Sequence, residues 1–254
     1  MAIDRNSSAF TFGFAIVMVL VVGAALSFAS MSLKPLQVQN NINKEMMSIL
    51  SSVGVESTRD NAQSDFYEYI TNRIVLNSQG EVIEEREGEI DASDKKEPFN
   101  VDVKKEYRDP SMEIGDRNYP LYVANIDGQK VYVIPMVGKG LWGPIWGYVA
   151  LESDYNTIFG ATFDHKSETP GLGAEIKEDF FEEPFAGKTI YDEQGNLVSI
   201  NVKKGGAEPS NPHAVDAITG GTITSNGVQE MLERTFSVYD NYFEKNKTQT
   251  SQKI

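Results

Sequence analysis

One long apolar run near the N-terminus limits how this chain can fold. Residues 9–33 read AFTFGFAIVMVLVVGAALSFASMSL and contain no charged side chain. A helix needs about 20 apolar residues to cross the hydrocarbon core of a bilayer. A secretory signal is the alternative interpretation, but its apolar region is shorter, at about 7–15 residues. We therefore expect a retained membrane anchor over about residues 9–33, followed by one water-soluble domain.

The charges that flank this run leave its orientation open. Asp4 and Arg5 precede the run, and Lys34 and Lys44 follow it, so neither side has a clear positive excess. An excess of Lys and Arg is what marks the cytoplasmic side of a membrane helix. Long domains also cross membranes largely regardless of their charge. Composition alone therefore does not determine on which side of the membrane the domain lies.

The overall composition limits the classes of partner and cofactor that this chain can bind. The chain has 23 Lys and Arg against 37 Asp and Glu, which gives a net charge of −14. Such a charge opposes binding to nucleic acid and to anionic lipid. The absence of Cys excludes disulfides, iron–sulfur ligation and thiolate metal sites, and two His argue against a His-rich metal site. Redox chemistry in this chain would need an organic cofactor.

The pattern after the anchor predicts an α+β domain, a twisted and mainly antiparallel sheet with packed helices. Helical spacing of apolar residues predicts the helices, and alternating apolar residues around turn signals predict the strands. The clearest turn signal is Asp127-Gly128. The expected helices are residues 35–52, 65–72 and 227–243; the expected hairpins are residues 73–83, 119–135 and 188–202, with a further strand from residue 146.

These expectations divide the chain into four parts. Residues 1–33 hold the anchor, residues 34–58 form a stalk helix and connection, residues 59–243 form the domain, and residues 244–254 are a polar, frayed tail. Within the domain, residues 84–119 are strongly charged and read as a solvated loop excursion. We assign no chemistry to that section.

The run DAITGGTITS at residues 216–225 is the strongest functional signal. It begins with Asp216 and places Thr219 and Thr222 on either side of Gly220 and Gly221. Glycines let a backbone approach a phosphate closely and present unshielded N–H donors. The hydroxyl of Thr222 would then be exposed on a thin loop. An ordinary Gly-rich surface turn is the other interpretation.

A second Gly-rich run, GKGLWG at residues 138–143, could bring the backbone close to a planar ligand. Trp142 would then offer a stacking face, whereas the simpler interpretation is a turn whose Trp packs on the core. His213 lies nine residues before Thr222. It is either a surface His beside a Pro turn or a pocket residue that tunes a redox cofactor.

The run FDHKSETPGLG at residues 163–173 predicts a loop of specified shape. Pro fixes φ, and Gly171 permits unusual φ values. The backbone N–H groups and the hydroxyl of Thr169 could reach the heteroatoms of a ring. Leu172 could cover one face of that ring, and Glu168 adds a carboxylate beside it.

Together these runs resemble the C subunit of the bacterial sodium-translocating NADH:quinone reductase, a family that carries FMN in a phosphoester bond to a Thr. The resemblance covers the anchor, the stalk helix and then GKGLW, DYNTIFG, HxxETPGLG, FAGK and the acceptor motif, in that order. The family's acceptor motif is Asp-x-x-Ser/Thr-Gly-Ala-Thr, and Gly221 stands where Ala is usual. The run GKGLW favours this family over the G subunit of the Rnf-type complex.

The resemblance implies a covalent FMN on Thr222, attached by a separate flavin transferase. It implies that Asp216, Thr219, Gly220 and Gly221 form the loop that the transferase recognises. It implies no catalytic residue and no metal in this chain. The non-covalent flavin pocket would be formed by Trp142, Glu168, Thr169, Gly171, Leu172 and His213.

The resemblance also implies a place in a membrane complex. Electrons from NADH would cross membrane subunits, reach this FMN and pass to a second covalent FMN in the B subunit, with the D, E and F subunits as further partners. The domain would face the periplasm from a single pass through the inner membrane. The alternatives are the G subunit of an Rnf-type ferredoxin-linked complex, an anchored flavoprotein outside any pump, and a flavin-free membrane-anchored adaptor.

Overall fold

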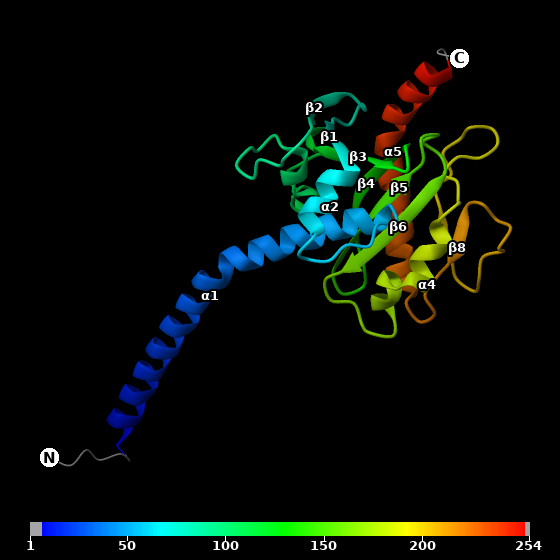
Figure 1. The fold of residues 1–254 in the computed structure, drawn as a ribbon. Helices are drawn as coiled ribbons and strands as arrows, with labels where there is room; N and C mark the ends of the chain where they lie inside the picture. The colour runs from blue at the N-terminus through cyan, green and yellow to red at the C-terminus, as the bar shows by residue number, and fades with distance from the viewer. Residues whose placement is uncertain (1–6, 252–254) are drawn as a thin grey trace. The chain divides into compact units, whose positions relative to one another are not determined.

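The computed structural model describes residues 7–251 of the chain (Figure 1). The described residues up to 45 and those from 46 onward form two compact units. Asp4 and Arg5, which precede the predicted anchor, lie outside the described residues. Helix α1 (Ser8–Ser52) is continuous through Pro35, so the predicted anchor and stalk belong to one helix. A part of α1 has a mean hydropathy of 2.5 over 18 residues, which makes it long and apolar enough to cross a membrane.

The second unit is built on a six-stranded sheet in the order β2-β1-β3-β4-β5-β6. Every neighbouring pair is antiparallel. This arrangement confirms the predicted α+β domain with a mainly antiparallel sheet. The strands are β1 (Ile70–Leu76), β2 (Val82–Arg86), β3 (Tyr119–Ile126), β4 (Gln129–Lys139), β5 (Pro144–Leu151) and β6 (Ile158–His165).

The predicted turn between β3 and β4 forms as expected. Ile126 pairs with Gln129, and the two residues between them have positive φ, at 50° for Asp127 and 84° for Gly128. Two positive φ values are the mark of a type I′ turn, which matches the twist of the flanking strands. Helix α2 (Ala62–Tyr69) ends earlier than the predicted 65–72, because Ile70 already belongs to β1.

The predicted hairpin at residues 188–202 is wrong. Tyr191 and Leu197 form only an isolated bridge. The backbone N–H groups of Val198 and Ser199 both donate to the Ile190 carbonyl, which breaks the ladder. The chain then enters β7 (Asn201–Lys203), which pairs in parallel with β8 (Ala214–Asp216). The sequence pattern also did not predict β6, because its final residues read as part of the loop at 163–173.

Helix α5 (Thr222–Ser251) packs across β4 and covers the core of the sheet (Figure 1). Its inward face includes Val228, Met231 and Leu232, each fully buried. The helix begins before the expected residue 227 and continues through the predicted tail to Ser251. The Lys245 ammonium donates to the Gln79 carbonyl at 2.8 Å, which helps hold that last part. Residues 252–254 lie outside the described residues.

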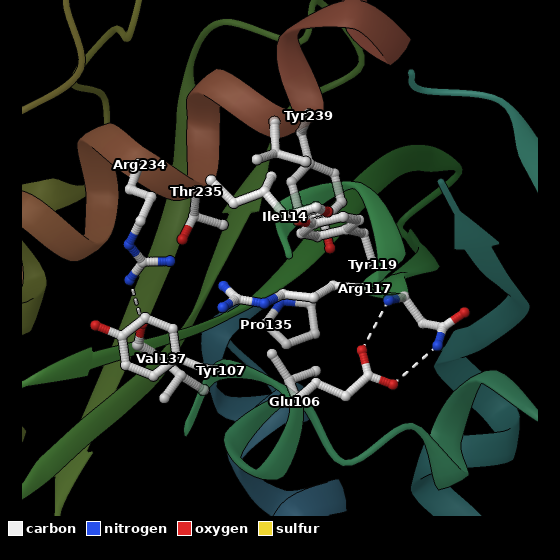
Figure 2. A pocket seen from close by; sticks show the side chains of 13 residues that line it. Glu106, Tyr107, Ile114, Arg117, Tyr119, Pro135, Val137, Arg234, Thr235 and Tyr239 are labelled. Atoms are coloured by element: carbon white, nitrogen blue, oxygen red, sulfur yellow. Dashed lines mark hydrogen bonds between the residues drawn. The ribbon is translucent and has the colours of Figure 1, made fainter. Parts of the chain in front are cut away.

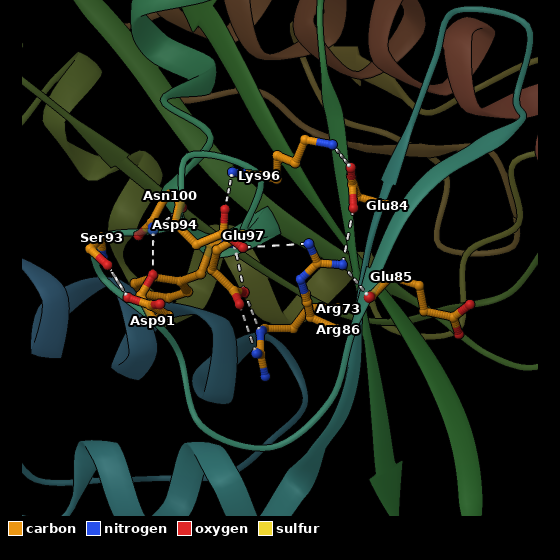
Figure 3. Close-up of polar contacts among 11 residues, drawn as sticks. Arg73, Glu84, Glu85, Arg86, Asp91, Ser93, Asp94, Lys96, Glu97 and Asn100 are labelled. Atoms are coloured by element: carbon orange, nitrogen blue, oxygen red, sulfur yellow. Dashed lines mark hydrogen bonds and ion pairs between the residues drawn. The ribbon is translucent and has the colours of Figure 1, made fainter.

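The charged section at residues 84–119 is more ordered than a solvated excursion. The guanidinium of Arg73 donates to both carboxylate oxygens of Glu97, at 2.6 and 3.0 Å (Figure 3). Arg73 is 0% exposed and Glu97 is 2% exposed. The section also contains short helices, so the prediction of a purely solvated loop is wrong. The remaining short helices are η1 (Pro98–Asn100), α3 (Val103–Arg108), η2 (Ile114–Asp116), η3 (Gly173–Lys177), α4 (Asp179–Glu182) and η4 (Glu183–Phe185).

Candidate functional site

Glu168 lies where three of the predicted functional runs meet. The residue is only 4% exposed. One carboxylate oxygen accepts from the backbone N–H of Trp142 at 2.8 Å and of Gly143 at 3.2 Å. The other accepts from the Leu141 N–H at 3.3 Å and from the Thr224 hydroxyl at 2.6 Å. One buried carboxylate therefore joins the β4–β5 loop and its own loop to the first turn of α5.

The charge of Glu168 is stabilised by dipoles. Burial by itself raises the pKa of this carboxyl. Hydrogen bonds from the Thr224 hydroxyl and from the three backbone N–H groups of the β4–β5 loop outweigh burial, and the pKa is lowered. Within residues 7–251, no Lys, Arg or His forms an ion pair with Glu168. The ionised carboxylate therefore acts inside the protein as an acceptor that orders the surrounding loops.

Glycines make this close packing possible. A Cβ on Gly140 would lie 2.6 Å from a carboxylate oxygen of Glu168. A Cβ on Gly173 would collide with the Thr224 hydroxyl, and one on Gly227 would collide with the Lys139 carbonyl. Any larger residue at these positions would push the loops and α5 apart. Gly140 and Gly173 in these two runs, and Gly227 in α5, therefore allow the segments to pack closely.

The hydroxyl groups within residues 216–225 fall into two classes, those that make internal hydrogen bonds and those that do not. Thr224 is buried and donates to Glu168, and the buried Ser225 hydroxyl accepts from the Ile218 N–H at 3.0 Å. Thr222 is half-buried and is the first residue of α5, rather than part of an exposed loop. Thr219 is exposed in the preceding turn. Two hydroxyls of the run are thus committed to internal contacts, and no hydrogen bond to the Thr222 or Thr219 hydroxyl is found within the described residues.

Large apolar side chains stand exposed on the segments that meet at Glu168. Trp142 is 66% exposed, Ile223 is 57% exposed and Leu172 is 40% exposed. Leu172 contacts the turn before α5, because a Cβ on Gly220 would lie 2.6 Å from its Cδ2 atom. Gly220 has a φ of 78°, which favours glycine in this turn. Three large exposed apolar side chains on segments that meet make this surface a candidate ligand site.

The other predicted site residues of these loops are exposed. The Thr169 carbonyl accepts from the N–H groups of Leu172 and Ala174, each at 3.1 Å, so Thr169 opens the tight turn. Gly171 has a φ of 75° and its backbone N–H donates to a carboxylate oxygen of Glu175 at 2.7 Å. Asp216 ends β8, and its carboxylate accepts from the Ala207 N–H. The structure thus gives Asp216 a contact with the loop before β8.

His213 makes its contacts elsewhere. Its Nδ1 atom lies 2.6 Å from the Thr189 carbonyl oxygen, so Nδ1 carries a proton and donates to it. Its own carbonyl accepts from the Asn201 N–H at 2.8 Å at the start of β7. These contacts tie His213 to the segment before β7 and give it a structural role there. The predicted flavin contact of His213 has no support from these hydrogen bonds.

Sequence reasoning missed the roles of Thr224 and His165. Thr224 belongs to the run of hydroxyl residues. Its place in the first turn of a helix was not predicted, because the helix was expected to start at residue 227. The Glu168 backbone N–H donates to Nδ1 of His165 at 3.1 Å, which fixes the start of the loop. The spacing of His165 three residues before Glu168 was the available signal.

Comparisons with known proteins agree with this site. An FMN-binding domain model matches residues 140–237, which include both loops and the start of α5. The C subunit of the Na⁺-translocating NADH-quinone reductase of Vibrio parahaemolyticus is 31% identical over 243 residues, covering 90% of each chain. The same subunit of Pseudomonas aeruginosa is 30% identical over 249 residues, covering 90% of this chain and 91% of that one.

Solved structures show the same fold. A crystal structure of this subunit from Parabacteroides distasonis has a TM-score of 0.71 and 40% identity, and covers 83% of this chain and 96% of that one. The structure of Shewanella oneidensis NqrC has a TM-score of 0.67 and 27% identity, and covers 82% of this chain and 99% of that one. This chain therefore belongs to the family of the Na⁺-translocating NADH-quinone reductase C subunit, an oxidoreductase subunit with an FMN-binding domain.

Proposed function

We propose that this chain carries FMN in a phosphoester bond to the Oγ1 atom of Thr222 and relays electrons within the reductase. This proposal rests on one observation, that the hydroxyl groups around the start of α5 differ in their internal hydrogen bonds. Thr224 and Ser225 are buried in internal contacts, whereas the hydroxyl of Thr222 has no internal partner among the described residues. Thr222 therefore keeps its oxygen available for a covalent bond.

The start of α5 also suits a phosphate. The first N–H groups of a helix have no partner within the helix and carry a partial positive charge. The backbone N–H of Ser225 donates to the Gly221 carbonyl, so Thr222 is in the first turn, where those N–H groups are free. Phosphate groups bind at such positions. A phosphoester on Thr222 would place its negative charge beside these donors, whereas Thr219 lies outside the helix.

The surroundings also suit a flat aromatic ring. Trp142, Leu172 and Ile223 present exposed apolar surface from the three segments that meet at Glu168. When bound, FMN supplies reversible electron transfer. The residues of this chain bind and orient it: the apolar side chains exclude water from the ring, and Glu168 holds the loops that carry them.

The proposal includes the wider setting of the family. Helix α1 would anchor the chain by a single pass through the inner membrane, with the domain in the periplasm. A flavin transferase would load the FMN by recognising Asp216, Thr219, Gly220 and Gly221. The B, D, E and F subunits would be the partners, and the electrons would originate from NADH and end on quinone. The apolar composition of α1 and the names of the relatives support this setting.

The test is intact-mass spectrometry of the full chain in detergent after coexpression with a flavin transferase. Wild-type chain should gain the mass of one FMN less one water. Thr222→Ala should show no gain. Thr219→Ala removes the same hydroxyl three residues earlier, within the loop that the transferase would recognise, so we expect it to load more slowly but to reach the same mass gain.

The possible results separate the candidate functions. Loss of flavin in Thr219→Ala with retention in Thr222→Ala would move the attachment site to Thr219. No gain in the wild-type chain, with a folded domain and a transferase shown to be active on another substrate, would contradict the covalent flavin. That outcome would favour the flavin-free adaptor.

A further inference from the structure

A second site lies away from Glu168, between the charged section and the middle of α5 (Figure 2). The cavity offers about 40 Å³ to the centre of a water molecule, several times the roughly 10–15 Å³ that one water needs. Its walls come from α3, η2, β3, β4 and α5. The walls are mainly aromatic and aliphatic, with side chains from Tyr107, Ile114, Tyr119, Pro135, Val137 and Tyr239.

Two guanidinium groups reach this cavity from opposite sides (Figure 2). The Arg234 guanidinium lies 4.4 Å from the centre of the Tyr107 ring, and that of Arg117 lies 5.8 Å from the same centre. Two cations around one ring repel each other unless an anion stands between them. Glu230 forms an ion pair with Arg234, whereas no ion pair to Arg117 is found within the described residues, so the charge of Arg117 points to an anionic ligand.

Arg117 is incompletely paired by the protein. One terminal nitrogen donates to the Met112 carbonyl at 3.2 Å, and no hydrogen bond of the other terminal nitrogen is found within the described residues. The Nε atom also lacks an acceptor there, but it is too deeply buried for a ligand in the cavity to reach. Glu106 also lines the cavity, but its two carboxylate oxygens accept from the backbone and side chain of Asn118, at 2.7 and 2.8 Å, and no ion pair between Glu106 and Arg117 is found within the described residues. Arg117 therefore keeps an N–H group that a ligand could satisfy.

Arg234 contributes a second positive charge from α5, and two hydrogen bonds hold its guanidinium in place. Its Nε atom donates to Glu230 at 2.7 Å, and a terminal nitrogen donates to the Val137 carbonyl. The other terminal nitrogen takes part in neither bond, so it can donate to a ligand without breaking them. The Tyr119 hydroxyl donates to the Ile114 carbonyl at 2.8 Å and holds the wall opposite. The cavity is thus a built site rather than a gap between loose chains.

We propose that this cavity binds a small organic carboxylate with a short apolar body. Its carboxylate would accept charge-assisted hydrogen bonds from the unpaired terminal nitrogen of Arg117 and from that of Arg234. The apolar body would lie among Tyr107, Tyr119 and Pro135. The cavity volume of about 40 Å³ sets the size of the enclosed part of the ligand, which is a few carbon atoms.

The test is ligand-observed NMR with butyrate and the full chain in detergent, titrated until binding saturates. Butyramide, which has the same shape without the charge, and inorganic phosphate, which has the charge without the apolar body, are the comparison probes. Each should bind at least tenfold more weakly than butyrate. The variant Arg117→Gln should weaken butyrate binding at least tenfold, and Arg108→Gln, at the end of α3, should leave it unchanged.

Several results would overturn the proposal. They are an absence of saturable butyrate binding, equal binding of butyramide or phosphate, and equal loss in the Arg108→Gln control. Should Arg117→Gln fail to fold, Arg117→Lys keeps the charge but lacks the planar guanidinium and its terminal nitrogens. We expect it to bind butyrate at least threefold more weakly, and unchanged affinity would contradict the role of the guanidinium.

Discussion

The proposed flavin site around Glu168, called the flavin site below, and the charged section each bury a carboxylate, but they stabilise its charge in different ways. Glu97 in the charged section is paired with the buried guanidinium of Arg73 through two hydrogen bonds (Figure 3). Glu168 in the flavin site accepts from three backbone N–H groups and from the Thr224 hydroxyl, and no cation among the described residues pairs with it. The first arrangement fastens two segments together. The second orders three loops around a surface that stays open to a ligand.

This difference predicts how each region responds to loss of its carboxylate. Removing one partner of a buried ion pair leaves the other charge uncompensated. Replacing a carboxylate that is held by dipoles leaves no buried charge, but it leaves donors without acceptors. The charged section should therefore lose more stability, and the flavin site should lose more function.

The largest effect should come from Glu97→Gln. We expect it to lower the free energy of unfolding by about 3–5 kcal/mol, because Arg73 stays buried without its counter-charge. Urea unfolding followed by circular dichroism measures this loss. The double variant Arg73→Met with Glu97→Leu should lose less than the single variant. A larger loss in the double variant would show that the pair itself supplies the stability.

A third carboxylate, that of Glu182, has weaker support, because within the described residues it forms no ion pair and accepts one backbone hydrogen bond. Burial raises the pKa of Glu182 to about 8, against a hydrogen bond from the Phe163 N–H. The neighbouring charges of Asp179, Asp164 and Glu178 act in the same direction as burial. The folded pKa thus exceeds its usual value of 4.5, so the folded state binds the proton more tightly. This contribution to stability is fully present below about pH 4.5 and is lost as the pH rises through about 8.

The comparison of wild type with Glu182→Gln isolates that contribution. Raising the pH from 5 to 9 should lower the Tm of the wild-type chain by at least about 3 °C relative to the variant. Glu183→Gln, an exposed neighbour, is the control and should follow the wild type. Parallel Tm curves for wild type and Glu182→Gln would show that the carboxyl is ionised in the folded protein.

A smaller loss of stability is expected for Glu168→Gln. Its amide nitrogen would face the N–H donors of Trp142 or the hydroxyl of Thr224, at a cost of about 1–3 kcal/mol. Flavin loading by the transferase should slow about tenfold or more, because the start of α5 loses its fixed position. Gel fluorescence of the flavin over time measures the rate. Equal slowing in Glu175→Gln, on the same loop, would argue against a specific role for Glu168.

The smallest effect should come from Gly220→Ala. A positive φ costs a non-glycine residue about 1 kcal/mol, and the new methyl group would press on Leu172. Gly171→Ala is the matched control, because its φ is 75° and no atom lies within 4 Å of the place that its Cβ would take. Urea unfolding should show a lower free energy of unfolding in both variants, with the larger loss in Gly220→Ala. The difference between the two losses measures the cost of the contact with Leu172. Equal losses would mean that Leu172 moves aside freely.

Much of the fold and part of the site could be predicted from local sequence signals. The Asp127-Gly128 turn and the alternation in β3 and β4 act locally, so the sequence shows them directly. The parallel pairing of β7 with β8 depends on segments that are apart in the sequence and on the positive φ of Ser199, which no short pattern reveals. The ion pair of Arg73 with Glu97 was not predicted for a related reason. A run of charged residues indicates solvent exposure unless the partner on a distant strand is known.

The site shows the same division. The glycines and Leu172 were singled out because an ordinary turn rarely combines so many conformational constraints with an exposed aliphatic side chain. The burial of Glu168 was not found, because it depends on three loops meeting. The early start of α5 was missed because Gly220 and Gly221 read as loop residues, although Ser225 caps the turn that precedes the helix.

The most direct test of the central claim is a peptide map of the flavin-loaded chain. Trypsin should release residues 205–234 as one peptide, which contains Thr219, Thr222, Thr224 and Ser225. Fragmentation by electron transfer then locates the added mass. Our account predicts FMN less one water on Thr222 alone. Finding it on Thr224 or Ser225, whose hydroxyls are buried in internal contacts, would contradict the account.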